Sequence, residues 1–107
     1  MAGALFKVRG DSMAPTLLDG DYVIGRRPSG RRPLRIGDVV VLNHSYYGRM
    51  VKRISDCDVD GRFRVRGDNA MTVASIDVGA VSLEQIERRV VFRVSPGAIG
   101  RVKSVTA

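Results

Sequence analysis

The sequence predicts a mostly β fold, in which a compact antiparallel sheet coils into a barrel-like shape and carries one or two short helical turns. Short β-rich segments follow one another closely, turn residues separate them, and only two short stretches are suited to helix. The 107 residues are 44% hydrophobic, which is sufficient apolar material for one core. We therefore expect a single domain over residues 1–107.

Six segments are expected to be strands, because β-branched and aromatic residues fill them and glycine, aspartate or proline follows them. In chain order they are Leu5–Arg9, Asp21–Arg26, Asp38–Asn43, Gly48–Ser55, Arg62–Arg66 and Arg88–Ser95. The third contains the unbroken apolar run Val39–Leu42, which is typical of a strand buried on both faces. The tail after Pro96 is expected either to add a last strand or to remain loose.

Two stretches are expected to form single helical turns. Ala14–Leu18 has a proline at its second residue, where the missing N–H is tolerated. Ser82–Ile86 begins with a serine, a residue that caps helix N-termini. Neither stretch is long enough for a helix that would change the fold class.

The chain is basic, and arginine is its usual cation. The 18 lysines and arginines exceed the 11 acidic residues, giving a net charge of +7. One segment is densest in arginine, with proline, serine and glycine between the cations: Arg26, Arg27, Arg31, Arg32 and Arg35. Three interpretations remain open for it: a solvated loop, a docking patch for a membrane surface or a protein partner, and a nucleic-acid site. Aromatic residues are only 6% and scattered, so we expect no nucleic acid among the partners.

The sequence also bears on location and cofactors. The longest clear apolar run is far shorter than the roughly 18–20 residues that span a bilayer, and Met1–Phe6 is too short for a signal peptide. We expect a cytoplasmic protein without a transmembrane anchor. The acidic stretch Asp56–Gly61 imitates half of a calcium loop, but Gly67 occupies the twelfth position, where a glutamate is required. We expect no metal and no cofactor.

Ser12 and Lys52 are the candidate catalytic pair. Ser12 follows the first predicted strand and the Gly10-Asp11 turn, which can present both its hydroxyl and its backbone N–H to a ligand. Strand periodicity places Lys52 on the same face as Met50 and Ile54. If that face is buried, the lysine pKa falls and the amine can serve as a general base. The alternative is an edge lysine whose ammonium reaches solvent.

Four sequence blocks together resemble the catalytic core of the type I signal peptidase family of Ser-Lys endopeptidases, whose clan includes the LexA-like self-cleaving proteins. The blocks, in order, are Gly10–Leu17 with Gly20-Asp21, Gly37–Val40, Val51–Ile54, and Gly67–Asn69 followed by Ser75–Asp77. The lack of an anchor and the small size make the chain similar to the maturation proteases that trim the leader of nickel superoxide dismutase.

The resemblance implies a role for each matching residue. Ser12 would be the nucleophile, with its own backbone N–H in the oxyanion hole, and Lys52 would be the general base. Ser75 would orient the lysine amine, with Asp77 beside it. Supporting roles would fall to Asp68 and Asn69, which shape the turn behind the site, and to Met13 and Pro15, which line the substrate pocket.

The expected function is therefore a serine endopeptidase that removes an N-terminal leader or signal-like segment from a partner protein, a nickel superoxide dismutase precursor being one candidate. The substrate would bind as an extended strand beside the site. Two alternatives remain open: a LexA-like regulatory module that cleaves itself or has lost catalysis, and a basic β-barrel that binds nucleic acid.

Overall fold

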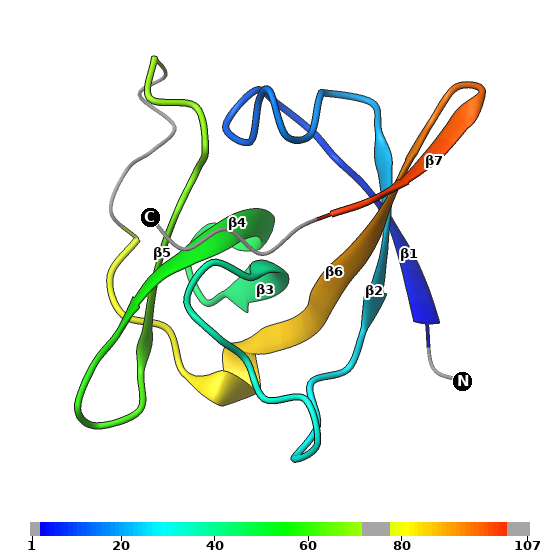
Figure 1. The fold of residues 1–107 in the computed structure, drawn as a ribbon. Coiled ribbons are helices and arrows are strands. Elements are labelled where there is room, and N and C mark those ends of the chain that lie inside the picture. The colour runs from blue at the N-terminus through cyan, green and yellow to red at the C-terminus, as the bar shows by residue number, and fades with distance from the viewer. Residues whose placement is uncertain (1–2, 72–77, 103–107) are drawn as a thin grey trace.

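Seven antiparallel strands and one short helix make up the chain in a computed structural model that describes residues 3–71 and 78–102 (Figure 1). The elements are β1 (Gly3–Lys7), β2 (Tyr22–Arg26), β3 (Val39–His44), β4 (Gly48–Cys57), β5 (Phe63–Arg66), the 3-10 helix η1 (Leu83–Gln85), β6 (Ile86–Ser95) and β7 (Ala98–Arg101). Neighbouring strands follow the order β1-β2-β6-β3-β4-β5, and β7 pairs with β6. The sheet coils without closing, so the predicted mostly β fold is confirmed.

The central strand β3 divides the interior into two apolar clusters. Val39 and Val41 pack with Val8, Met13, Leu17, Val23 and Val90. Val40 and Leu42 point to the opposite face and join Ile54, Val65, Val81 and Ile86. The side chains of Val39–Leu42 are at most 2% exposed, because β4 and β6 flank the strand and both of its faces are covered. The unbroken apolar run thus marks a strand buried on both sides, as predicted.

Three irregular pairings bend the sheet. Register shifts occur at Ile24/Gly25 between β2 and β6, at Val41/Leu42 between β3 and β6, and at Ile54/Asp56 between β4 and β5. Such bulges increase local twist and curl a sheet toward a barrel. At the first, a Cβ on Gly25 would lie 2.7 Å from the Cβ of Arg88, so only glycine allows this close approach of the two strands.

The two predicted helical turns both exist, in shortened form. Residues 13–17 make one turn, in which the Leu17 N–H donates to the Met13 carbonyl at 3.0 Å, and the Ala14–Pro15 peptide bond is cis. The second is η1, where Gln85 Oε1 accepts from the Ser82 N–H at 2.9 Å. Beyond Pro96 the chain adds β7, so the last-strand alternative is the correct one for Ala98–Arg101.

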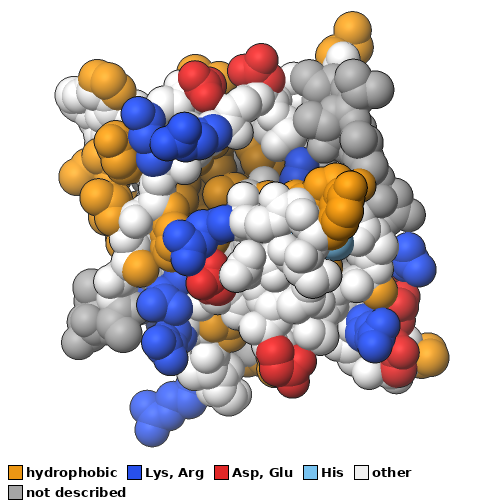
Figure 2. Space-filling view, turned by 180° about the vertical axis from the view of Figure 1, so that it is seen from behind, with side chains coloured by type: hydrophobic (Ala, Val, Ile, Leu, Met, Phe, Trp, Pro, Cys, Tyr) orange, Lys and Arg blue, Asp and Glu red, His pale blue; other side chains and the backbone are white. Residues whose placement is uncertain are grey.

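Charged side chains of both signs are distributed over the surface. On the face drawn in Figure 2, Lys and Arg side chains form several separate groups with Asp and Glu side chains between them. Residues 3–71 and 78–102 contain no helix that combines the length and the apolar character needed to cross a bilayer.

Candidate active site

The Ser12 segment is a tight turn anchored in the core. It follows β1 through Gly10, whose φ of +82° lies in the region that favours glycine, and the Gly10 N–H donates to Asp19 Oδ1 at 2.7 Å. Met13 and Leu17 are 1% and 0% exposed and pack into the first apolar cluster. Met13 and Leu17 thus hold this segment in the core, while Ser12, which precedes Met13, is partly exposed.

The chain contains two Arg-Gly-Asp turns, and the second (Arg66–Asp68), which follows β5, packs directly against the first (Arg9–Asp11). The backbone N–H of Asn69 donates to the Ser12 carbonyl at 2.9 Å, and its side-chain Nδ2 donates to the Asp11 carbonyl at 3.0 Å. Gly67 lies against the same residue: a Cβ there would meet the Ser12 Cβ at 3.2 Å and would come still closer to the Ser12 carbonyl oxygen. The Gly67–Asn69 turn thereby fixes the position of Ser12.

Asp68 connects this turn to the strand that carries Lys52. Its carboxylate accepts two hydrogen bonds from Arg53, Nε to Oδ1 and Nη2 to Oδ2, both at 2.7 Å, and one from Thr16 Oγ1 at 2.5 Å. Arg53 also donates to the Gly37 carbonyl at 2.6 Å. Because Arg53 immediately follows Lys52 in β4, this network ties the Ser12 turn to the lysine strand.

The ionisation of Asp68 reflects that network. Burial opposes the charged carboxylate, but the hydrogen bonds from Arg53 and Thr16 and the charges of Arg53 and Arg66 outweigh burial and lower the pKa of Asp68 below its usual value. The Arg53–Asp68 ion pair is therefore formed throughout the neutral range.

Lys52 is a buried cation in the middle of β4. It lies opposite Val40 in the β3–β4 ladder, and the residue is only 6% exposed. Burial lowers the pKa of the Lys52 amine, since removal from water disfavours the ammonium form. The expectation that this position of β4 is buried is therefore confirmed.

Ser12 and Lys52 line the same groove, whose volume is about 560 Å³. Met13 contributes to its wall, together with two strand segments that come from opposite parts of the sheet, namely 5–9 in and after β1 and 49–52 in β4. An open groove bordered by a hydroxyl and a buried amine can hold an extended chain with its carbonyl groups near both.

The remaining predicted site residues fall into three groups. Asp68 and Asn69 lie in the turn that packs against Ser12. Pro15 is exposed and does not line the groove, whereas Met13 does. Ser75 and Asp77 lie outside the described residues. Sequence reasoning did not identify Arg53 as the partner of Asp68; its only signal was its position beside Lys52.

His44 does not contribute to this site. Its Nδ1 accepts from the N–H groups of Tyr46 and Tyr47 at 3.0 and 3.1 Å, so the proton lies on Nε2, which donates to the Val78 carbonyl at 2.9 Å. Nδ1 therefore stabilises the β3–β4 turn, and Nε2 connects that turn to Val78. Among residues 3–71 and 78–102, no three His, Cys, Asp or Glu side chains are grouped so that they could hold a metal ion.

Comparison with protein families gives a match over most of the chain. The family model described as Peptidase S24-like matches residues 2–91, which include Ser12, Lys52 and both Arg-Gly-Asp turns. This family belongs to the clan of LexA and the signal peptidases, so the clan-level prediction is confirmed. No curated protein and no solved structure matches the chain. The matched region covers most of the molecule, including the groove, and the chain accordingly belongs to the Peptidase S24-like family.

Proposed function

We propose that the protein is a serine endopeptidase in which Ser12 is the nucleophile and Lys52 the general base. The observation that carries this proposal is that Ser12 and a buried lysine of lowered pKa line one open groove. A serine hydroxyl is a poor nucleophile unless a neighbouring base accepts its proton, and a neutral amine can be that base. Arginine could not do so, because its guanidinium does not lose a proton in proteins.

The reaction follows from these two groups. The neutral Lys52 amine takes the Ser12 hydroxyl proton as Oγ attacks the scissile carbonyl carbon, and the carbonyl oxygen becomes an oxyanion. Collapse of this intermediate breaks the C–N bond, and the Lys52 ammonium returns its proton to the leaving amine. Water then attacks the acyl ester with Lys52 again as base, which releases the new carboxylate and restores Ser12.

The Ser12 backbone N–H is proposed as an oxyanion donor. In the described part of the chain it donates to no protein acceptor, whereas the Ser12 carbonyl is held by Asn69. The turn is therefore fixed through its carbonyl side, and its N–H remains available to a ligand. A single such donor contributes about 10²- to 10³-fold in rate where it has been tested.

We propose that the substrate is an extended segment, the N-terminal leader of another protein. In the described part of the chain, β1 pairs with β2 alone, and residues 48–52 of β4 pair only with β3. Both segments border the groove, so each offers one strand edge to an incoming peptide. A nickel superoxide dismutase precursor is the specific substrate that we propose to test first.

A second candidate function is self-cleavage in a LexA-like regulatory module, which the family match favours. It uses the same two residues, but the scissile segment belongs to the same chain. The two functions differ in kinetics: self-cleavage is first order and independent of protein concentration, whereas leader removal accelerates with enzyme concentration.

The decisive experiment co-expresses the protein with leader-bearing candidates, including a nickel superoxide dismutase precursor, and reads their N-termini by mass spectrometry. Shortened N-termini are expected with the wild-type chain and not with Ser12→Ala or Lys52→Met. Ser29→Ala, which removes an exposed hydroxyl from the β2–β3 loop, is the matched control and should cleave normally. Cleavage that persists in both Ser12→Ala and Lys52→Met would refute the proposed dyad.

A further inference from the structure

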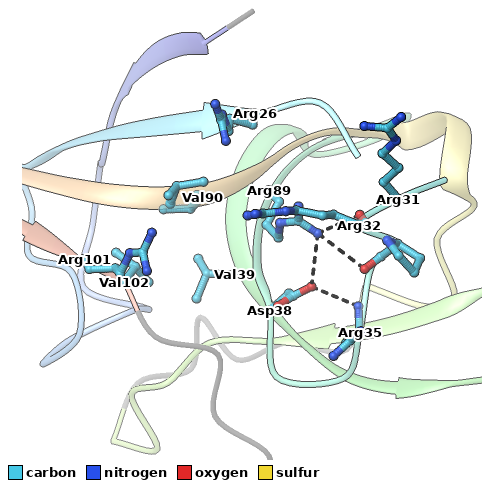
Figure 3. A pocket seen from close by; sticks show the side chains of 12 residues that line it. Arg26, Arg31, Arg32, Arg35, Asp38, Val39, Arg89, Val90, Arg101 and Val102 are labelled. Atoms are coloured by element: carbon cyan, nitrogen blue, oxygen red, sulfur yellow. Dashed lines mark hydrogen bonds and ion pairs between the residues drawn. The ribbon is translucent and has the colours of Figure 1, made fainter. Parts of the chain in front are cut away.

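A second cavity lies away from the groove, between β6, the end of β7 and the loop that joins β2 to β3. Its volume is about 790 Å³, and it shares no lining residue with the groove that contains Ser12 and Lys52. Six arginines line it: Arg26, Arg31, Arg32, Arg35, Arg89 and Arg101 (Figure 3). We call it the arginine pocket.

One of these arginines, Arg89, holds the β2–β3 loop in place beside β6. The Arg89 Nη1 donates to the carbonyls of Arg32 at 2.8 Å and Pro33 at 3.3 Å, and lies 4.0 Å from Asp38 Oδ2. The same Asp38 oxygen accepts from the Arg35 N–H at 2.9 Å. Asp38 is buried, and among the described residues it is the only acidic one that lines the pocket. The Asp38 carboxylate therefore helps to hold the β2–β3 loop against β6.

The other five arginines are exposed, and within residues 3–71 and 78–102 none of them is ion-paired with a carboxylate. Elsewhere on the molecule, by contrast, Arg49, Arg53 and Arg93 each pair with an acid at 2.7–2.8 Å. Five arginines that form no ion pair with a described carboxylate therefore line this one hollow. Their mutual repulsion is unfavourable unless an anion occupies it.

The five come from three separate elements and surround the hollow. Figure 3 shows Arg101, from β7, on one side of Val39, and Arg32 and Arg35, from the loop, on the other. Arg26 at the end of β2 completes the set. Only the loop arginines and Arg26 are close in sequence, so the sequence gives no indication that Arg89 and Arg101 join them.

The chemistry of the lining selects a class of ligand. Guanidinium groups bind phosphate oxygens in a bidentate manner, and several of them can hold several phosphates at once. The cavity is larger than one phosphate ion requires and lies within the roughly 300–1,000 Å³ typical of ligand pockets. Among the described residues, its remaining lining is valine and proline, so the pocket offers no aromatic ring on which a nucleobase could stack.

We propose that the arginine pocket binds an anion that carries two or more clustered phosphate groups, either a soluble molecule or the headgroup of a membrane lipid. This site is independent of the proposed peptidase chemistry, because none of its residues borders the groove.

The test is calorimetric titration of the full chain with inorganic tripolyphosphate at near-physiological salt, in parallel with sedimentation on phosphatidylcholine vesicles that contain a phosphatidylinositol bisphosphate. Saturable binding of either probe is expected, with orthophosphate at least about tenfold weaker than tripolyphosphate, since a single phosphate engages fewer guanidinium groups. Binding of tripolyphosphate alone identifies a soluble ligand, and binding of the vesicles alone identifies a lipid headgroup. Absence of binding by both probes would overturn the proposal.

Matched variants distinguish specific binding in the arginine pocket from attraction by the net charge of the protein. Arg31→Gln combined with Arg32→Gln should weaken binding by about tenfold or more, and Arg101→Gln should weaken it as well. Arg62→Gln combined with Arg64→Gln removes the same charge from the β4–β5 hairpin and should leave affinity within about twofold of wild type. Equal losses in the two double variants would show non-specific attraction and overturn the proposal. Ser12→Ala should bind as wild type does, so a failure of the peptidase proposal would not affect this result.

Discussion

The backbone N–H of Asn69 donates a hydrogen bond to the carbonyl oxygen of Ser12 at 2.9 Å, which joins the two Arg-Gly-Asp turns of the chain. The first turn presents Ser12 and the second holds it from behind, while Asp68 in the second turn is bound by Arg53 on the Lys52 strand.

Replacement of Gly67 by alanine should strongly reduce cleavage. The added Cβ would lie 3.1 Å from the Ser12 carbonyl carbon and closer still to its oxygen, so the Ser12 turn must shift. A displacement of about 1 Å at a reacting group can cost about 10²-fold in rate. The measurement is kcat/KM on a cleaved leader peptide. Gly100→Ala, where a Cβ meets nothing within 4 Å, is the control and should retain full activity.

Asp68→Asn should lower the free energy of unfolding by about 3 kcal/mol, because it removes the carboxylate charge that pairs with the buried Arg53 guanidinium. Urea unfolding at neutral pH measures this loss. Asp58→Asn breaks the 3.5 Å ion pair between Asp58 and Arg64, whose side chains are 31% and 47% exposed, respectively. It should lower the free energy of unfolding by no more than about 1 kcal/mol. Equal effects of the two substitutions would contradict a structural role for the Arg53–Asp68 pair.

Acid should remove the contribution of the Asp68 carboxylate to the free energy of unfolding. The pKa of Asp68 is lowered from 3.8 in the folded state, so the contribution is fully present above 3.8 and is lost as the pH falls through the lowered value. The difference in unfolding free energy between wild type and Asp68→Asn should therefore narrow below pH 3.8. A difference that stays constant across this range would show that the carboxylate charge is not what stabilises the fold.

Peptidase activity should increase with pH as Lys52 loses its proton, with a midpoint below the ordinary lysine pKa of 10.5 because burial lowers the pKa of this amine. The pH profile of kcat/KM on a leader peptide measures it. Lys52→Arg preserves the positive charge but cannot act as a base, so it should abolish the activity. A flat profile from mildly acidic to alkaline pH would count against a lysine base.

The same amine should make stability depend on pH. Between its lowered folded pKa and the ordinary value of 10.5, the unfolded chain binds the Lys52 proton and the folded protein does not, so the folded state gains stability as the pH rises through this interval. The Lys52→Met variant has no amine at this position, so it should not gain stability from this source as the pH rises. Urea midpoints of the two proteins should therefore diverge in favour of the wild type as the pH rises, and parallel midpoints would indicate an unshifted amine.

A substrate that binds as an added strand should depend on its own backbone N–H groups. Methylation of alternate amide nitrogens beside the scissile bond should reduce kcat/KM, because each methyl removes one hydrogen bond to the edge of β1 or β4. Methylation at the intervening positions, which point away from that edge, is the control. If both patterns of methylation have the same effect, the peptide does not pair with either strand.

Much of the fold could be predicted because its signals are local. The Val39–Leu42 run predicts a strand covered on both faces, and the alternation around Lys52 predicts which neighbours share its face. A strand needs only a few consecutive residues to reveal its period, and a turn needs only a glycine or aspartate at the right place. The boundaries of the central strands accordingly differ from the predictions by at most two residues.

The composition and order of the residues thus determined a β-rich chain with a serine in a tight turn and a lysine within a strand. Only the tertiary structure decided that β3 lies opposite β4 so that Lys52 is buried, that Arg53 reaches Asp68, and that Arg89 and Arg101 join the loop arginines. These contacts depend on strand register, bulges and twist, which bring distant segments together. Such long-range pairings are collective properties of the folded sheet, and no short stretch of sequence specifies them.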